Sequence, residues 1–261
     1  MPETAAEAIN IVKVILMCTL PSKLQNDAII ESILEIQFNA NVPDDAVYGL
    51  VYPTLNRHYP NTTTLPITNI PEEIRRTDPS LRYHAWYTFE KHPLRINLGP
   101  RSIAFINTKP YLGWNDWSTH INHVLGEIKE INLINSVERI GLRYINFFNE
   151  KILNKAHIKL QIAKKEIDNE STSVRTEFIS GEYTIILQIG SNVNAFSGDS
   201  NLLGSIIDID CIILKSMDSG EFFNKFSSLT EEAHKKGKQL FFELIGNELL
   251  ESLNAAPGGE Q

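Results

Sequence analysis

The chain is poor in cysteine: its 261 residues include only Cys18 and Cys211. Secreted proteins of this size usually use more cysteines, so the scarcity argues against a disulfide framework and favours a cytoplasmic protein. A long hydrophobic run is also missing, because the apolar segment 9–20 is short and is interrupted by polar residues. It matches neither a signal peptide nor a membrane span. We expect residues 1–20 to be an N-terminal extension that packs on the body as a helix or strand.

The motifs of several common enzyme classes are absent. There is no Walker A loop, no G-x-G-x-x-G, no G-x-S-x-G elbow, no H-E-x-x-H and no cysteine-based zinc pattern. Of the seven histidines, only His120 and His123 have a ligand-like spacing, and a solvated pair on the polar flank of a helix is the simpler interpretation. Active sites assemble in space, so these absences lower the expectation of catalysis without excluding it. We therefore expect no cofactor and favour a non-enzymatic role.

The chain has little excess of positive charge anywhere. It carries 24 Lys and Arg against 32 Asp and Glu, a net charge of −8. A general nucleic-acid binder needs a cationic surface to neutralise phosphates, so this balance argues against one. A local exception is the stretch 71–110, where arginines interleave with aromatic residues, and Trp86 is a candidate for stacking on a base or a partner. The alternative is that these rings form the core face of a sheet.

The hydrophobic patterns predict an α+β fold made of two sheet-plus-helix halves. In the first half, residues 21–149, strands are expected at 29–38, 81–90, 94–98, 102–107 and 137–148, and helices after Pro43 and from Asn115 or Asp116. This order suggests a ferredoxin-like sandwich of the βαββαβ type. The polar segment 61–79 is expected to be a loop, either an excursion over the sheet or a mobile lid.

The second half, residues 150–254, is expected to be an antiparallel sheet with a long C-terminal helix laid across it. Strands are predicted at 156–168, 176–179, 182–189 and 205–214, with a hairpin turn at Ser180-Gly181 and a loop at 192–203. Helical spacing continues to Leu253, and Gly237 and Gly246 are the places where that helix can bend or break. The tail, residues 255–261, is expected to be disordered.

The strand around RIGLRY at 139–144 contains the most distinctive charged pattern. Alternation places Arg139, Gly141 and Arg143 on one face of that strand. Two guanidinium groups beside a glycine could cradle an anion or a carboxylate. The simpler interpretation is that both arginines pair with acids on neighbouring elements, such as Glu138 or Glu35.

Two further clusters are weaker candidates. Tyr111 and Trp114 surround a glycine at a helix start and could form a platform for a peptide, although a staple that anchors the helix is the simpler interpretation. Asp208 and Asp210 lie on one face of a predicted strand and could hold a divalent metal. A metal site needs more ligands than these two carboxylates, and a solvent-facing or paired arrangement explains them equally well.

Three blocks of the sequence together carry a resemblance: ESILEIQF at 31–38, the segment 111–117 with its helix, and RIGLRYINFF at 139–148. In order and spacing these blocks resemble an uncharacterised, sporadically distributed bacterial protein family of similar length. Segments 208–210 and 241–250 agree more weakly with the same family. The resemblance implies a bacterial cytosolic protein with the patchy occurrence of defence and toxin–antitoxin genes. It implies no activity and no site.

Together these observations favour a non-catalytic, cytoplasmic interaction protein of a bacterial defence or toxin–antitoxin system, without membrane contact. The expected partner is another protein, encoded by a neighbouring gene, or a second copy of the chain. Two alternatives stay open. One is a nucleic-acid-binding or processing protein that uses the Arg139 and Arg143 face. The other is a metal-dependent hydrolase that uses Asp208 and Asp210.

Overall fold

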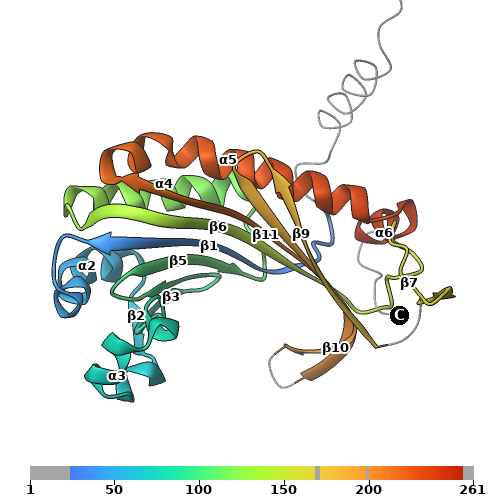
Figure 1. Cartoon of the computed structure of the whole chain (residues 1–261), viewed down its shortest axis with the longest axis horizontal. Coiled ribbons are helices and arrows are strands. Elements are labelled where there is room, and N and C mark those ends of the chain that lie inside the picture. The colour runs from blue at the N-terminus through green and yellow to red at the C-terminus, as the bar shows by residue number, and fades with distance from the viewer. Residues whose placement is uncertain (1–23, 168–170, 198–199, 255–261) are drawn as a thin grey trace, which may run out of the picture.

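A large antiparallel sheet forms the body of the protein, and the computed structural model describes residues 24–167, 171–197 and 200–254 (Figure 1). Its nine strands lie in the order β2-β3-β4-β5-β1-β6-β11-β10-β9. Their bounds are β1 (Ile29–Ala40), β2 (Asn61–Thr64), β3 (Tyr87–Lys91), β4 (Leu94–Leu98), β5 (Ser102–Thr108), β6 (Ile134–Phe148), β9 (Thr172–Ser180), β10 (Tyr183–Ser197) and β11 (Ser200–Asp218). Two short strands, β7 (Gln161–Ile162) and β8 (Lys165–Glu166), form a separate hairpin.

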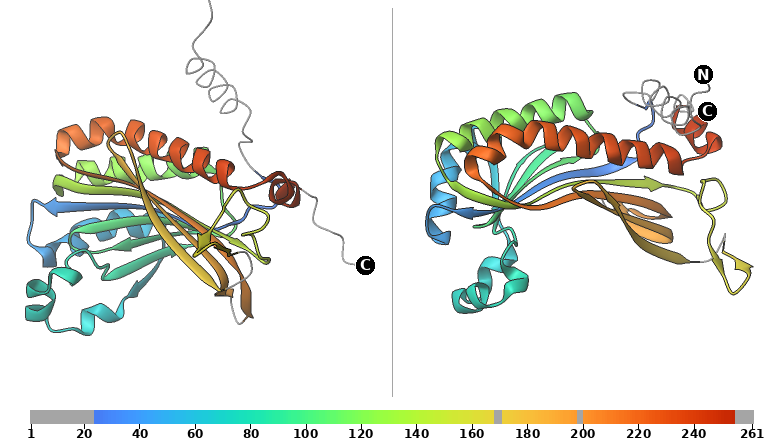
Figure 2. Two further views of the ribbon diagram at one scale, coloured as in Figure 1. Left: turned by 45° about the vertical axis from the view of Figure 1, so that its right-hand side comes forward. Right: turned by 45° about the horizontal axis from the view of Figure 1, so that its top comes forward.

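Three helices cover one face of the sheet. These three are α2 (Asp44–His58), α4 (Trp114–Glu130) and α5 (Ser219–Leu244). The other described helical segments are α3 (Glu72–Thr77), α6 (Asn247–Asn254) and the 3₁₀ turns η1 (Pro66–Asn69) and η2 (Pro79–Leu81). α5 packs on β6 and β11, α4 lies beside α5, and α2 contacts α4 and β3. Figure 2 shows α4 and α5 side by side above the sheet, with α3 projecting to the opposite side. No helix in the described part of the chain is both long and apolar enough to cross a membrane.

Alternation along β1 explains why only one face is covered. Leu34, Ile36 and Phe38 are buried against the helices, whereas Glu35 and Gln37 point to the other side. α4 presents a matching apolar stripe to the sheet at the expected helical spacing. The stripe consists of Trp117, Ile121, Val124, Leu125 and Ile128, all buried. The opposite sheet face, which we call the uncovered face, carries charged side chains such as Glu35 and Arg143 together with apolar ones such as Ile33.

The α+β class and the C-terminal helix are confirmed, but a ferredoxin-like first half is not. A βαββαβ sandwich is a unit of four strands, whereas six described strands, β1 to β6, precede residue 149 in this chain. Here β1 lies between β5 and β6 and is antiparallel to both. The sheet also continues across the boundary predicted near residue 149, because β6 pairs with β1 on one side and with β11 on the other. The buried apolar residues of both halves form one cluster.

Several local predictions differ from the structure. The segment 61–79 is not a plain loop, because it contains β2, η1 and α3, and β3 begins only at Tyr87. In segment 156–168, whose residues are described up to 167, the predicted strand is replaced by the small β7–β8 hairpin, whose turn has positive φ at Ala163 and Lys164. The polar segment 192–203, expected as a loop, carries the extended ends of β10 and β11.

Glycines set two of the helix boundaries. α4 begins at Trp114, earlier than the predicted cap, because Gly113 precedes it with φ of +94°. The C-terminal helix breaks at Gly246, where a Cβ atom would lie 2.5 Å from the backbone oxygen of Lys155. Gly237 remains inside α5. Cys211 is a buried free thiol. The predictions for residues 1–20 and 255–261 lie outside the described residues.

The one-sided cover predicts unequal effects of truncation along β1. We expect Ile36→Ala to lower the free energy of unfolding by about 2–5 kcal/mol, because a fully buried side chain leaves a cavity. Ile33→Ala, on the uncovered face and only half-buried, should cost clearly less. Urea denaturation of both variants measures the difference. Equal losses would contradict the assignment of the two faces.

Candidate interaction surface

Arg139 bridges three strands at the centre of the uncovered face. Its Nη1 is hydrogen-bonded to Glu35 on β1, and its Nη2 lies 3.0 Å from Asp210 Oδ2 on β11. The guanidinium reaches both carboxylates by lying over Gly141, where a Cβ atom would come within 2.7 Å of Arg139 Nη1. The glycine therefore makes room for the bridge. The sequence placed Arg139 on this face and named Glu35 as a partner, but did not identify Asp210.

Arg143 is held two residues further along β6 by a bidentate contact. Its Nε donates to Asp208 Oδ1 at 2.8 Å and its Nη2 to Asp208 Oδ2 at 2.6 Å. Hydrogen bonding to Asp208 raises the pKa of Arg143. Gln188 on β10 also donates to Asp208 Oδ2, at 3.3 Å. Such two-point contacts are among the stronger ion pairs in proteins, so two of the three nitrogens of this guanidinium are already engaged by a carboxylate.

The two aspartates are occupied by arginine rather than arranged for a metal. Burial raises the pKa of Asp210, which indicates that its charge is only partly compensated by the neighbouring guanidinium groups. Its Oδ1 is buried and accepts no hydrogen bond from the described residues. Within that part of the chain, Asp208 and Asp210 do not join a third carboxylate, histidine or cysteine at metal-binding distance. Two cations already sit where a metal would have to bind.

Trp86 lines an open cavity of about 630 Å³. The guanidinium of Arg75 stacks over its indole ring at 4.1 Å. Arg76, Arg82 and Arg101 also line this cavity. Each of the latter three forms an ion pair with an acidic residue. The arginines of the stretch 71–110 therefore lie near aromatic rings as expected, but most of their charge is compensated.

Trp114 joins the two long helices. Its Nε1 donates to Glu231 Oε2 on α5 at 2.6 Å, and its ring stacks on His234 at 4.5 Å. Burial lowers the pKa of His234 to about 4, so this imidazole is neutral at pH 7. Tyr111 lines a small cavity of about 80 Å³ beside α5, with Tyr144 as an edge-on neighbour. Trp114 thus holds α4 against α5, whereas Tyr111 borders a space too small for a peptide.

The sheet ends in an exposed strand that the sequence did not single out. Of the strands that the structure describes, β9 pairs only with β10 (Figure 1). Ile179 is 85% exposed and Phe178 is 43% exposed. β9 contains neither the lysines nor the prolines that commonly protect sheet edges. The hairpin turn was predicted, but its position at an edge depends on the order of all nine strands.

The ion-pair network predicts that Arg139 matters more for stability than surface arginines do. Arg139→Met leaves Glu35 and Asp210 without their shared cation, and we expect a loss of about 1–3 kcal/mol, below the ~3–5 of a fully buried pair because solvent screens this site. Arg76→Met, at an exposed ion pair, should change stability by less than about 0.5 kcal/mol. Thermal or urea unfolding of both variants measures this.

The same variant has a defined pH dependence. Without Arg139, the pKa of Asp210 in the folded state rises further above its value in the unfolded chain. The folded state then holds its proton more tightly, so stability falls as the pH rises through the shifted pKa. The deficit of Arg139→Met should therefore shrink on acidification. A deficit that is constant between neutral and acidic pH would contradict the ion-pair role.

Comparison with known proteins adds no assignment to this geometry. No protein-family model matches the chain. No curated protein matches its sequence closely enough to indicate a relationship. The resemblance of the three sequence blocks to a sporadic bacterial family therefore stays a prediction.

Proposed function

We propose that this chain is a non-catalytic interaction protein whose binding element is the β9 edge. The observation that carries the proposal is a nine-residue strand with exposed apolar side chains that pairs, among the described strands, with β10 alone. An open edge offers unpaired backbone donors and acceptors to a second strand, the usual basis of β-strand addition. A bacterial defence or toxin–antitoxin setting is part of the proposal and is supported by the sequence resemblance alone.

The sequence of β9 is complementary to itself, which favours a second copy of the chain as the partner. In an antiparallel pair centred on Thr176, Arg175 of one copy faces Glu177 of the other, and this contact occurs twice. Val174 likewise faces Phe178. Cross-strand pairs of opposite charge and of apolar residues each contribute about 0.2–1 kcal/mol. A register shifted by two residues loses both charge pairs, so the twofold register is specified.

The two kinds of contact fall on different faces of the joined sheet. Val174 and Phe178 pair within the chain with Ile189 and Ile185, which are buried on the helix-covered face. Their cross-copy contacts would extend the apolar side of the sheet. Arg175 and Glu177 lie on the uncovered face, where they form an exposed ion pair at 2.7 Å. Exchanging this pair between copies costs little, because exposed ion pairs contribute only about 0–1 kcal/mol.

A charge-swap series tests this register. A single strand pair is a small interface, so we expect a weak, concentration-dependent dimer. Arg175→Glu places like charges opposite each other twice and should weaken self-association. The double variant Arg175→Glu/Glu177→Arg restores both pairs and should restore the dimer. Sedimentation velocity over a concentration series measures association, and Arg76→Glu is the control with the same change in charge.

Two outcomes would remove the proposal in this form. One is a wild-type chain that stays monomeric into the millimolar range, where even weak pairs associate. The other is a double variant that remains as impaired as Arg175→Glu, because the register requires rescue. A partner copurified from the native host that is lost in Arg175→Glu and not regained in the double variant would point to a different protein on the same edge.

Nucleic-acid binding and metal-dependent hydrolysis are weaker alternatives. The arginines on which the first depends, Arg139 and Arg143, are held by carboxylates. The aspartates on which the second depends are the partners in those same contacts. A salt-dependent interaction with RNA or DNA that is lost in Arg139→Ala/Arg143→Ala would revive the first. Metal-dependent hydrolysis lost in Asp208→Asn would revive the second.

A further inference from the structure

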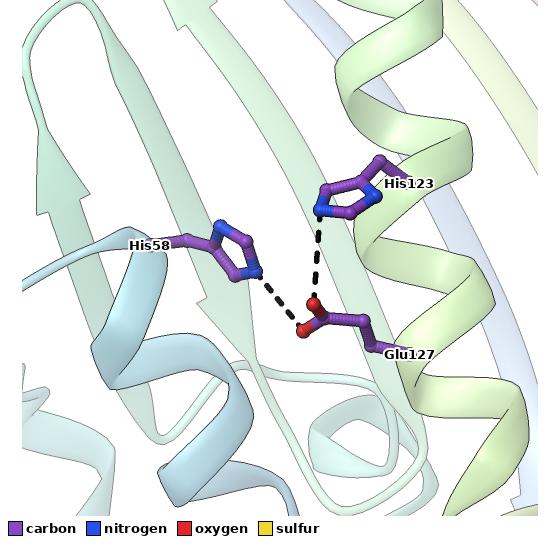
Figure 3. Close-up of side chains that lie close together, drawn as sticks. All are labelled: His58, His123 and Glu127. Carbon is purple, nitrogen blue, oxygen red and sulfur yellow. Dashed lines mark hydrogen bonds and ion pairs between the residues drawn. The ribbon is translucent and has the colours of Figure 1, made fainter.

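A group of metal-ligating side chains lies between α2 and α4 and includes His123. His58 is the last residue of α2, and His123 and Glu127 are one turn apart on α4 (Figure 3). All three ligand atoms lie within 4.8 Å of one another. Among the described residues this is the one group of three or more such side chains that are close enough to share an ion.

Helix geometry and helix packing together create the group. Residues four apart on a helix lie on the same face, so His123 and Glu127 point in the same direction. α2 packs against α4, which brings the C-terminal turn of α2 to that face. His58 Nε2 lies 3.0 Å from Glu127 Oε2, and His123 Nε2 lies 3.7 Å from Glu127 Oε1. In Figure 3 both imidazole rings turn a nitrogen toward the carboxylate.

We propose that His58, His123 and Glu127 bind a divalent transition-metal ion, with Zn²⁺ as the best match. Zinc takes histidine nitrogen and carboxylate oxygen at about 2.0–2.2 Å in tetrahedral geometry, which separates neighbouring ligand atoms by roughly 3.4 Å. Each imidazole lies beside its own oxygen of Glu127, at 3.0 Å from Oε2 for His58 and 3.7 Å from Oε1 for His123. Because one ligand atom from each residue falls within 4.8 Å of the others, small side-chain rotations bring the three to zinc-binding separation. Three protein ligands leave a fourth position to water, and the pair of imidazoles favours zinc over magnesium or calcium.

Arg57 is the one described cation in contact with the group. Its Nη2 lies 3.1 Å from Glu127 Oε2, and its side chain is 66% exposed. An exposed ion pair of this kind is easily broken, so the guanidinium can turn into solvent when an ion arrives. His120 does not belong to the group, and its Nε2 instead contacts the hydroxyl of Tyr59. The sequence spacing drew attention to His123 together with His120, whereas the structure groups His123 with His58 and Glu127.

The bound ion would clamp α2 to α4. The two helices are far apart in sequence, and the clamp lies on the side of the sheet opposite the uncovered face. Because the site requires both helices in their folded positions, the ion binds the folded state and stabilises it. At a hundred-fold excess of free Zn²⁺ over Kd, we expect Tm to rise by about 5–10 °C. This proposal is independent of self-association through β9.

The test uses the full chain after removal of metal with a chelator. Titration with Co²⁺, which replaces zinc and absorbs visible light, should saturate at one ion per chain with the spectrum of a four-coordinate site. Zn²⁺ should displace it. Glu127→Gln and His123→Ala should each weaken binding by at least about 100-fold, because even loss of an outer-shell partner costs ~10–100-fold. Arg57→Gln should strengthen it by removing the competing cation.

The controls separate this site from other sources of binding. His84→Ala removes an exposed histidine outside the group and should leave Co²⁺ affinity unchanged. His123 is 63% exposed, so its variant should fold normally, and circular dichroism verifies this. The proposal is overturned if the wild-type chain gives no Co²⁺ spectrum at millimolar metal. It is equally overturned if folded Glu127→Gln and His123→Ala bind as tightly as the wild type, which would place the ion elsewhere.

Discussion

The structure depends on β6 and its pairing on both sides. This strand of 15 residues bonds to β1 along one edge and to β11 along the other. Its Ile140 and Leu142 enter the core beneath the helices, while Arg139 and Arg143 hold the carboxylates of the neighbouring strands on the opposite face. One strand therefore supplies both the apolar contacts that join the two halves and the ionic contacts that tie β1 to β11.

Many individual strands and helices could be predicted from the sequence, because each one depends on the spacing of apolar residues within a short segment. The strand predicted at 29–38 and the helix predicted from Asn115 or Asp116 both appear in the structure, as β1 and α4. The sequence did not predict how the strands are arranged in the sheet, because that arrangement depends on the topology of the whole chain. Nothing local distinguishes two separate sheets from one, and the continuity through β6 is visible only when β1 and β11 are placed on either side of it.

The candidate sites show the same division. The sequence correctly placed Arg139, Gly141 and Arg143 on one face, since alternation along a strand is sufficient for that. It did not show that Arg139 spans from Glu35 to Asp210, because those residues come from strands far apart in the chain. His58 was missed for the same reason: the i,i+4 relation of His123 and Glu127 was present in the sequence, but their third companion comes from another helix.

In the proposed self-association, the unequal lengths of the two edges of the described sheet would limit how large an assembly can grow. β9 has nine residues, whereas β2 at the opposite edge has four. Pairing β9 with β9 is an isologous contact that uses each long edge once and leaves only the short β2 edges outermost. Pairing β9 with β2 would be a head-to-tail contact able to continue indefinitely, but most of β9 would have no partner. The asymmetry therefore favours a closed pair over a growing fibre.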